Sequence, residues 1–99
     1  MISIITPNEM VKHLALRAKF KRLSLNMSQK TLSERSGVSY GVLKKFEQTG
    51  QISLKSLLKI ALSLGTLEDF YDLFAFKKPE EAISFDDLLK DNSRKRGRK

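Results

Sequence analysis

The positions of helix caps and glycines constrain this chain more than any other feature of its sequence. Thr6-Pro7-Asn8-Glu9 forms a capping box with proline at the first helical position, and it predicts a helix that runs to about Leu25. Ser28, Ser39 and Ser53 can each cap a further helix, and a glycine follows each of these segments. The pattern predicts helices over residues 29–36, 40–48 and 54–64, which stop at Gly37, Gly50 and Gly65.

The remaining segments complete an all-α fold. Thr66-Leu67-Glu68-Asp69 resembles another capping box and predicts a fifth helix through Phe74. Residues 2–5 are the only strand candidate, and residues 77–79 break the helical pattern before one short helix over 85–90. Residues 91–99 contain no hydrophobic side chain and are expected to be disordered. We expect one domain over 1–76, and an acidic linker with a short helix and a basic disordered tail over 77–99. The stripe expected to be buried in helix 54–64 is Leu54, Leu57, Leu58, Ala61 and Leu62.

Length and composition exclude several classes of protein. The 99 residues suffice for one small domain with a tail. Without cysteine, the chain can form neither a disulfide nor a thiolate metal site. No apolar run approaches the ~20 residues of a membrane span, and the start MISII lacks the charged flank of a signal peptide. We therefore expect a soluble, cytoplasmic protein.

The net charge of +8 is distributed unevenly along the chain. Residues 1–60 hold eleven Lys/Arg and three Asp/Glu, which gives +8, whereas residues 66–91 hold three and eight, which gives −5. Residues 94–99, RKRGRK, add +5. A basic surface of this size suits a polyanion such as nucleic acid, although it can also serve solubility alone.

Helix 40–48 has the composition of a surface that meets such a polyanion. It is too short to be stable alone in water, so its apolar side, Val42, Leu43 and Phe46, must dock on a scaffold. Its other side combines cations, a phenol and an amide, which suit a DNA major groove because lysine can donate to guanine and to phosphates. Gly41 would let the helix approach DNA closely. The residues of this outer side are Tyr40, Gly41, Lys44, Lys45 and Gln48.

The sequence contains no convincing catalytic, phosphate-binding or metal site. No serine has a credible His–Asp arrangement, and no glycine-rich phosphate loop follows a strand. The single histidine, His13, cannot build a metal site. The acids between Glu68 and Asp87 are most simply a solvated face, or they repel DNA from the wrong side. We expect no enzyme activity, no cofactor and no metal.

The sequence resembles the Xre-type helix-turn-helix family, which includes the lambdoid phage repressors and Cro, because several residues match that family in both identity and spacing. The resemblance covers roughly residues 10–74 and implies a five-helix, lambda-repressor-like DNA-binding domain. Ser33 departs from the family, which usually has alanine there, and Thr49 lengthens the turn after Glu47 by one residue. The matching residues are Ser28-Gln29, Leu32, Ser36-Gly37-Val38-Ser39, Leu43, Phe46-Glu47, Gly50, Leu57, Ile60-Ala61 and Leu64-Gly65.

The resemblance also implies roles for single residues. Gln29 would bind a DNA phosphate beside the N-terminal amides of its helix, and a buried ion pair would join Arg22 to Glu47. Arg96-Gly97-Arg98 is similar to the core of minor-groove AT-hooks, although a plain polybasic tail is the simpler interpretation. The expected DNA-binding residues are Ser28, Gln29, Ser39, Tyr40, Gly41, Lys44, Lys45, Gln48, Thr49, Arg94, Lys95, Arg96 and Arg98.

A narrower likeness is to HipB-type antitoxins, which repress the operon they share with a HipA-like kinase toxin and bind that toxin. The alternatives are a stand-alone Xre-type regulator, and a protein–protein module whose basic face meets an acidic partner. One short recognition helix reads few base pairs, so we expect a homodimer on an inverted-repeat operator of double-stranded DNA, in the nucleoid. The dimer contact would use Phe70, Leu73, Phe74 and Phe76, which could also be core residues, or else the MISII segment.

Overall fold

The computed structural model describes residues 5–97, except for the side chains of Ala82 and residues 91–97. No strand occurs among residues 5–97, so the all-α fold class is as predicted; of the strand candidate, residues 2–4 lie outside the described part. The helices are α1 (Pro7–Ser24), α2 (Gln29–Ser36), α3 (Tyr40–Thr49), α4 (Leu54–Ser63), the short 3-10 helix η1 (Leu67–Phe70) and α5 (Pro79–Gly97).

The first four helices begin at the predicted caps. The Thr6 hydroxyl accepts from the Glu9 N–H at 3.1 Å, and the Glu9 carboxylate accepts from the Thr6 N–H at 3.3 Å, which completes the capping box. The hydroxyls of Ser28, Ser39 and Ser53 each accept from the N–H three residues later, at 3.0–3.2 Å. These caps need only neighbouring residues, which is why the sequence predicts them well.

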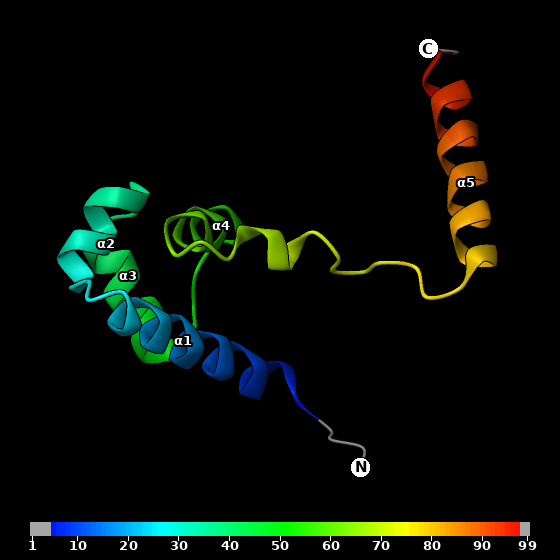
Figure 1. Cartoon of the computed structure of the whole chain (residues 1–99). Helices are drawn as coiled ribbons and strands as arrows, with labels where there is room; N and C mark the ends of the chain where they lie inside the picture. The colour runs from blue at the N-terminus through cyan, green and yellow to red at the C-terminus, as the bar shows by residue number, and fades with distance from the viewer. Residues whose placement is uncertain (1–4, 98–99) are drawn as a thin grey trace.

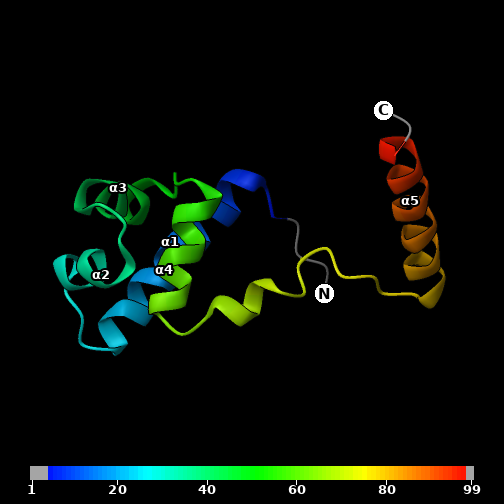
Figure 2. The same cartoon turned by 90° about the horizontal axis from the view of Figure 1, so that it is seen from above.

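Helices α1 to α4 form one unit around a single core, with α2 and α3 together at one end (Figures 1 and 2). Each of the four helices contributes to the core, as do the loops after α1 and α2. The buried hydrophobic side chains of this cluster are Ala15, Met27, Leu32, Val38, Leu43, Phe46, Ile60 and Leu64.

The buried side of α4 differs from the stripe that the sequence predicts. Of the predicted stripe, Ala61 is buried and Leu57 and Leu58 are half-buried, but Leu54 and Leu62 are exposed. Ile60 and Leu64, which are not in the predicted stripe, are buried. The apolar side chains of α4 span a broad arc opposite Lys55 and Lys59, and the structure buries one edge of that arc, so periodicity alone does not select which edge faces α2.

The prediction of a fifth helix over residues 66–74 is wrong, because the segment forms a 3-10 helix that is shorter than predicted. The Thr66 hydroxyl donates to the Ala61 carbonyl at 3.3 Å and caps nothing, and only residues 67–70 form a 3-10 helix. The chain then turns, and Phe74 has a φ of +62° and is fully exposed. A helix this short needs packing to persist, and the side chains of residues 71–74 are all exposed.

Helix α5 is longer than predicted, and it includes residues 91–97, which were expected to be disordered. Pro79 is the first residue of the helix. The carboxylates of Glu80 and Glu81 lie in its first turn, where negative charge stabilises the positive end of the helix dipole. The Glu81 carboxylate also accepts from the Lys77 N–H at 3.3 Å. Residues 80–96 contain no glycine or proline that would interrupt the helix. Absence of hydrophobic side chains therefore does not prevent helix here, because the polar residues that follow Asp91 include good helix formers.

Helix α5 stands apart from α1–α4 in both views, at the end of an extended linker (Figures 1 and 2). The radius of gyration is 17.9 Å, against about 13 Å for a compact chain of this length. Phe76 of the linker packs on Phe85 of α5, with 5.1 Å between the ring centroids. None of the helices between residues 5 and 97 combines the length and the hydropathy needed to cross a membrane.

Candidate nucleic-acid interface

The turn between α2 and α3 is held by side chains on both sides of it. Gly37 adopts a left-handed φ of +76°, which a residue with a side chain rarely does. The Ser33 hydroxyl donates to the Val38 carbonyl at 2.6 Å, and the Ser36 hydroxyl accepts from the Val38 N–H at 3.1 Å. The Val38 side chain is buried in the core. The angle between α2 and α3 is therefore well determined, and the departure to serine at position 33 supplies a hydrogen bond that alanine could not.

Helix α3 is docked by one side and exposed on the other. Leu43 and Phe46 are buried, but Val42 is exposed, so the docked side is narrower than the sequence predicts. The structure places all the residues of the predicted outer side in solvent, on one face of the helix. They are Tyr40, Gly41, Lys44, Lys45 and Gln48.

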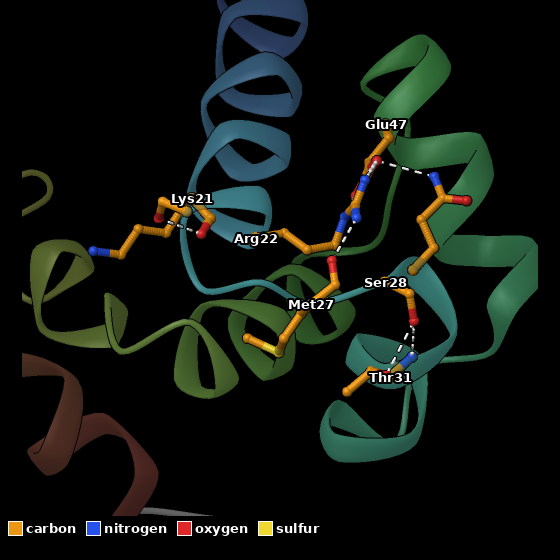
Figure 3. Close-up of polar contacts among 8 residues, drawn as sticks. Lys21, Arg22, Met27, Ser28, Thr31 and Glu47 are labelled. Carbon is orange, nitrogen blue, oxygen red and sulfur yellow. Dashed lines mark hydrogen bonds and ion pairs between the residues drawn. The ribbon is translucent and has the colours of Figure 1, made fainter.

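An ion pair fixes the end of α3 to α1, as the family resemblance implies (Figure 3). The Arg22 Nε donates to Glu47 Oε2 at 2.8 Å and Nη2 donates to Oε1 at 2.9 Å, while Nη1 donates to the Met27 carbonyl at 2.8 Å. The two side chains are only 7% and 3% exposed. Such a two-pronged, water-excluded pair sets one geometry, because a buried charge without its partner is very unfavourable.

Gln29 is the third member of this network, which the sequence does not predict. Its side-chain Nε2 donates to Glu47 Oε1 at 2.9 Å, and so links the start of α2 to the end of α3. A primary amide has two N–H donors, so this bond leaves one for a phosphate. Glu47 therefore orients the residue that was expected to hold DNA.

Two of the predicted DNA-binding hydroxyls are occupied within the protein. The Ser28 hydroxyl donates to Thr31 Oγ1 at 3.0 Å and accepts from the Thr31 N–H. The Thr49 hydroxyl donates to the Lys45 carbonyl at 2.7 Å and accepts from the Gln51 N–H at 3.1 Å. Near Ser28, the first N–H groups of α2 are then the natural donors to a phosphate.

A hollow joins the start of α2 to the start of α3, lined by Ser28, Gln29, Lys30 and Tyr40. Three of these residues were predicted to bind DNA, and Lys30 was not. Its signal in the sequence is its position directly after Gln29, where a cation would reach the same phosphate. We add Lys30 to the candidate interface.

The structure does not bring every predicted residue to this face. Arg94, Lys95 and Arg96 lie in α5, but their side chains are outside the described part, as is all of Arg98. Of the predicted dimer contacts, Phe70 is half-buried beside α4, and the other three are exposed along the linker rather than on a helix. The exposed three are Leu73, Phe74 and Phe76.

Comparison with known proteins agrees with this geometry. A family model described as helix-turn-helix matches residues 19–70, which is more than half of the chain and spans the end of α1 through η1. No curated protein matches the chain significantly.

Proposed function

The chain belongs to the helix-turn-helix family, and on that premise we propose that it is a sequence-specific DNA-binding regulator of transcription, which acts as a repressor. The observation that supports this proposal best is the exposed face of α3, where Tyr40, Lys44 and Lys45 stand together while the opposite side is buried. The Arg22–Glu47 pair holds that face in one orientation, which preorganised recognition of DNA requires.

In the proposed complex, α3 lies in the major groove. Tyr40, Gly41 and Lys45 would face base edges, and Lys44 would reach a base or the backbone. The hollow at Gln29 and Lys30 would receive a phosphate, which positions the helix but reads no sequence. Gln48 and Thr49 would meet the backbone at the far end of α3.

We further propose that residues 1–76 form the DNA-binding unit and residues 77–99 an arm. The unit would act as a homodimer, because two twofold-related recognition helices read an inverted repeat. A repressor of this kind acts by occupying a promoter, so it needs affinity and sequence preference but no catalysis.

The test first selects the duplexes that the protein binds from a random library. The dissociation constants of the selected duplex and of a scrambled version are then measured at several salt concentrations. We expect the protein to bind the selected duplex about 10³-fold or more tightly than the scrambled one, and to bind both more weakly as the salt concentration rises. Lys55→Ala, which changes an exposed lysine of α4, is the matched control and should leave the preference unchanged. Equal affinity for both duplexes would instead favour a protein–protein module.

A more specific proposal is that the chain is the antitoxin of a HipA-like kinase toxin and represses their common operon. Its support is the sequence likeness over SGVSYGVLKKFEQTGQISLKSLLKIALSLG, residues 36–65, together with the basic tail. The neighbouring reading frame provides the test. If it encodes a kinase-like protein that co-elutes with this chain and is neutralised by it, the proposal holds; an unrelated neighbour would leave a stand-alone regulator.

A further inference from the structure

Helix α1 carries an apolar stripe on the side that faces away from the core. Leu16, Phe20 and Leu23 are spaced four and three residues apart, and they are 52%, 61% and 48% exposed. The residues of α1 that face the core, Ala15 and Arg22, lie on the other side of the helix. A contiguous apolar stripe of this kind usually marks a contact surface.

Helix α5 carries the other unpartnered apolar face. Phe85, Leu88 and Leu89 lie along one side of it and are 43%, 62% and 47% exposed. The helix stands away from α1–α4 (Figure 1), and the Phe76 ring of the linker packs on its Phe85. A solitary helix of this length and polarity is marginal in water, so α5 requires a surface on which to bury this face.

The exposed part of α1 and the first part of α5 have opposite charge. Apart from the buried Arg22, α1 holds Lys12, Arg17, Lys19 and Lys21 against Glu9, whereas residues 79–90 of α5 hold Glu80, Glu81, Asp86 and Asp87 against Lys90. The cations of α5, Arg94, Lys95 and Arg96, come after its apolar face.

The positions of these charges match as well as their signs. Lys12 and Lys19 lie four residues before Leu16 and Leu23, so they border the stripe on α1. On α5, Asp86 lies three residues before Leu89 in the same way. An apolar stripe edged by cations and an apolar stripe edged by carboxylates are complementary surfaces.

We infer that α5 of one copy of this chain packs on the Leu16–Phe20–Leu23 stripe of α1 in a second copy, in a reciprocal exchange of arms. The extended linker carries α5 away from its own α1–α4 unit, which places it to reach another (Figure 2). Phe76, one of the residues that the sequence predicts at the dimer contact, packs on Phe85 beside this face, and the inference rests on the proposed homodimer. Helix α3 packs against the core side of α1, so an occupant of the outer stripe leaves the recognition face uncovered.

The chain contains no cysteine, which allows a direct test by site-specific cross-linking. Phe20→Cys and Leu88→Cys proteins are mixed at micromolar concentration and oxidised, and the mixed disulfide dimer is quantified. The matched control mixes Leu88→Cys with Leu62→Cys, because Leu62 is about as exposed as Phe20, at 65% against 61%, but lies on α4. We expect the 20–88 dimer to form at least about tenfold faster than the control, since only that pair would be held in contact.

A second measurement uses charge. Phe20→Glu should weaken self-association by about tenfold or more in light scattering, whereas Leu62→Glu should not. A 20–88 cross-link no faster than the control would overturn the inference, as would one found only within single chains of the Phe20→Cys/Leu88→Cys double variant. A dimer without this cross-link leaves the proposed homodimer standing, whereas absence of sequence preference in the unsubstituted protein overturns the proposed function instead.

Discussion

Among single residues, Glu47 has the widest structural role. Its carboxylate accepts from Arg22 of α1 and from Gln29 of α2, while its backbone belongs to α3. In the described part of the chain, every buried side-chain nitrogen and oxygen has a hydrogen-bond partner. The network therefore joins three helices at the point where the candidate interface must be rigid.

Loss of either charge of the pair should be strongly destabilising. We expect Glu47→Ala and Arg22→Met each to lower the free energy of unfolding by ~3–5 kcal/mol, because each leaves the other side chain without its buried partner. The double variant should lose clearly less than the sum, since no uncompensated charge remains. Urea denaturation of the four proteins measures this, and strictly additive losses would contradict it.

Base reading and phosphate binding should separate in two further variants. We expect Lys45→Ala to cost ~1–3 kcal/mol on the selected site and to relax preference at one base position, because it removes a base-edge donor. Gln29→Ala should weaken all sequences about equally. Equal losses for Lys45→Ala on selected and scrambled duplexes would rule out its base-reading role. Thermal melts of the Gln29 variant must accompany the titrations, since it also loses the bond to Glu47.

At the scale of elements, the end of α3 is seated closely on α1. Gly50 has a φ of +82°, and a Cβ built there would lie 2.7 Å from the Val11 carbonyl oxygen and 2.8 Å from its carbon. Gly37 has a similar φ of +76°, but a Cβ there would meet nothing within 4 Å. A side chain at position 37 would therefore meet only backbone strain, whereas one at position 50 would meet both backbone strain and a clash with α1.

This difference predicts unequal effects of the same substitution. Gly37→Ala should lower the free energy of unfolding by about 1–2 kcal/mol, which is the cost of a left-handed alanine. Gly50→Ala should lower it by more, because backbone atoms of Val11 must also move. Denaturation curves of both variants measure the two changes. Equal decreases in the free energy of unfolding would mean that α1 can move away from residue 50 at no cost in free energy.

The tail is a second element whose contribution can be isolated. Deleting residues 94–99 removes five cations, so it should lower DNA affinity and flatten the dependence of affinity on salt. Titrations of the intact and shortened proteins at several salt concentrations measure the change. An unchanged slope would show that the tail does not touch DNA and would point to a protein partner.

For the whole molecule, the number of base pairs read determines the assembly. One recognition helix touches about four or five base pairs, too few to single out a site among the ~10⁶ or more positions of a genome. We expect light scattering at micromolar protein to give a dimer, and footprinting to show two half-sites about 34 Å apart. A monomer in both states that protects one half-site would overturn this prediction.

The sequence predicts features that depend on neighbouring residues. The capping box at Thr6, the serine caps and the glycine at position 37 act through bonds within a few residues, so helices α1 to α4 begin and end within a residue or two of the prediction. The outer face of α3 follows from helical periodicity once Leu43 and Phe46 are assigned to the core.

Packing between distant segments decided the remainder. Which side of α4 is buried depends on where α2 lies, and Thr66 caps no helix because its hydroxyl binds Ala61 instead. The Gln29–Glu47 bond and the hollow at Lys30 exist only because α2 and α3 meet at the angle that the buried turn imposes. A short stretch of sequence determines local hydrogen bonds, because their donors and acceptors are a few residues apart. Contacts between distant residues depend instead on how the helices are arranged in the folded chain.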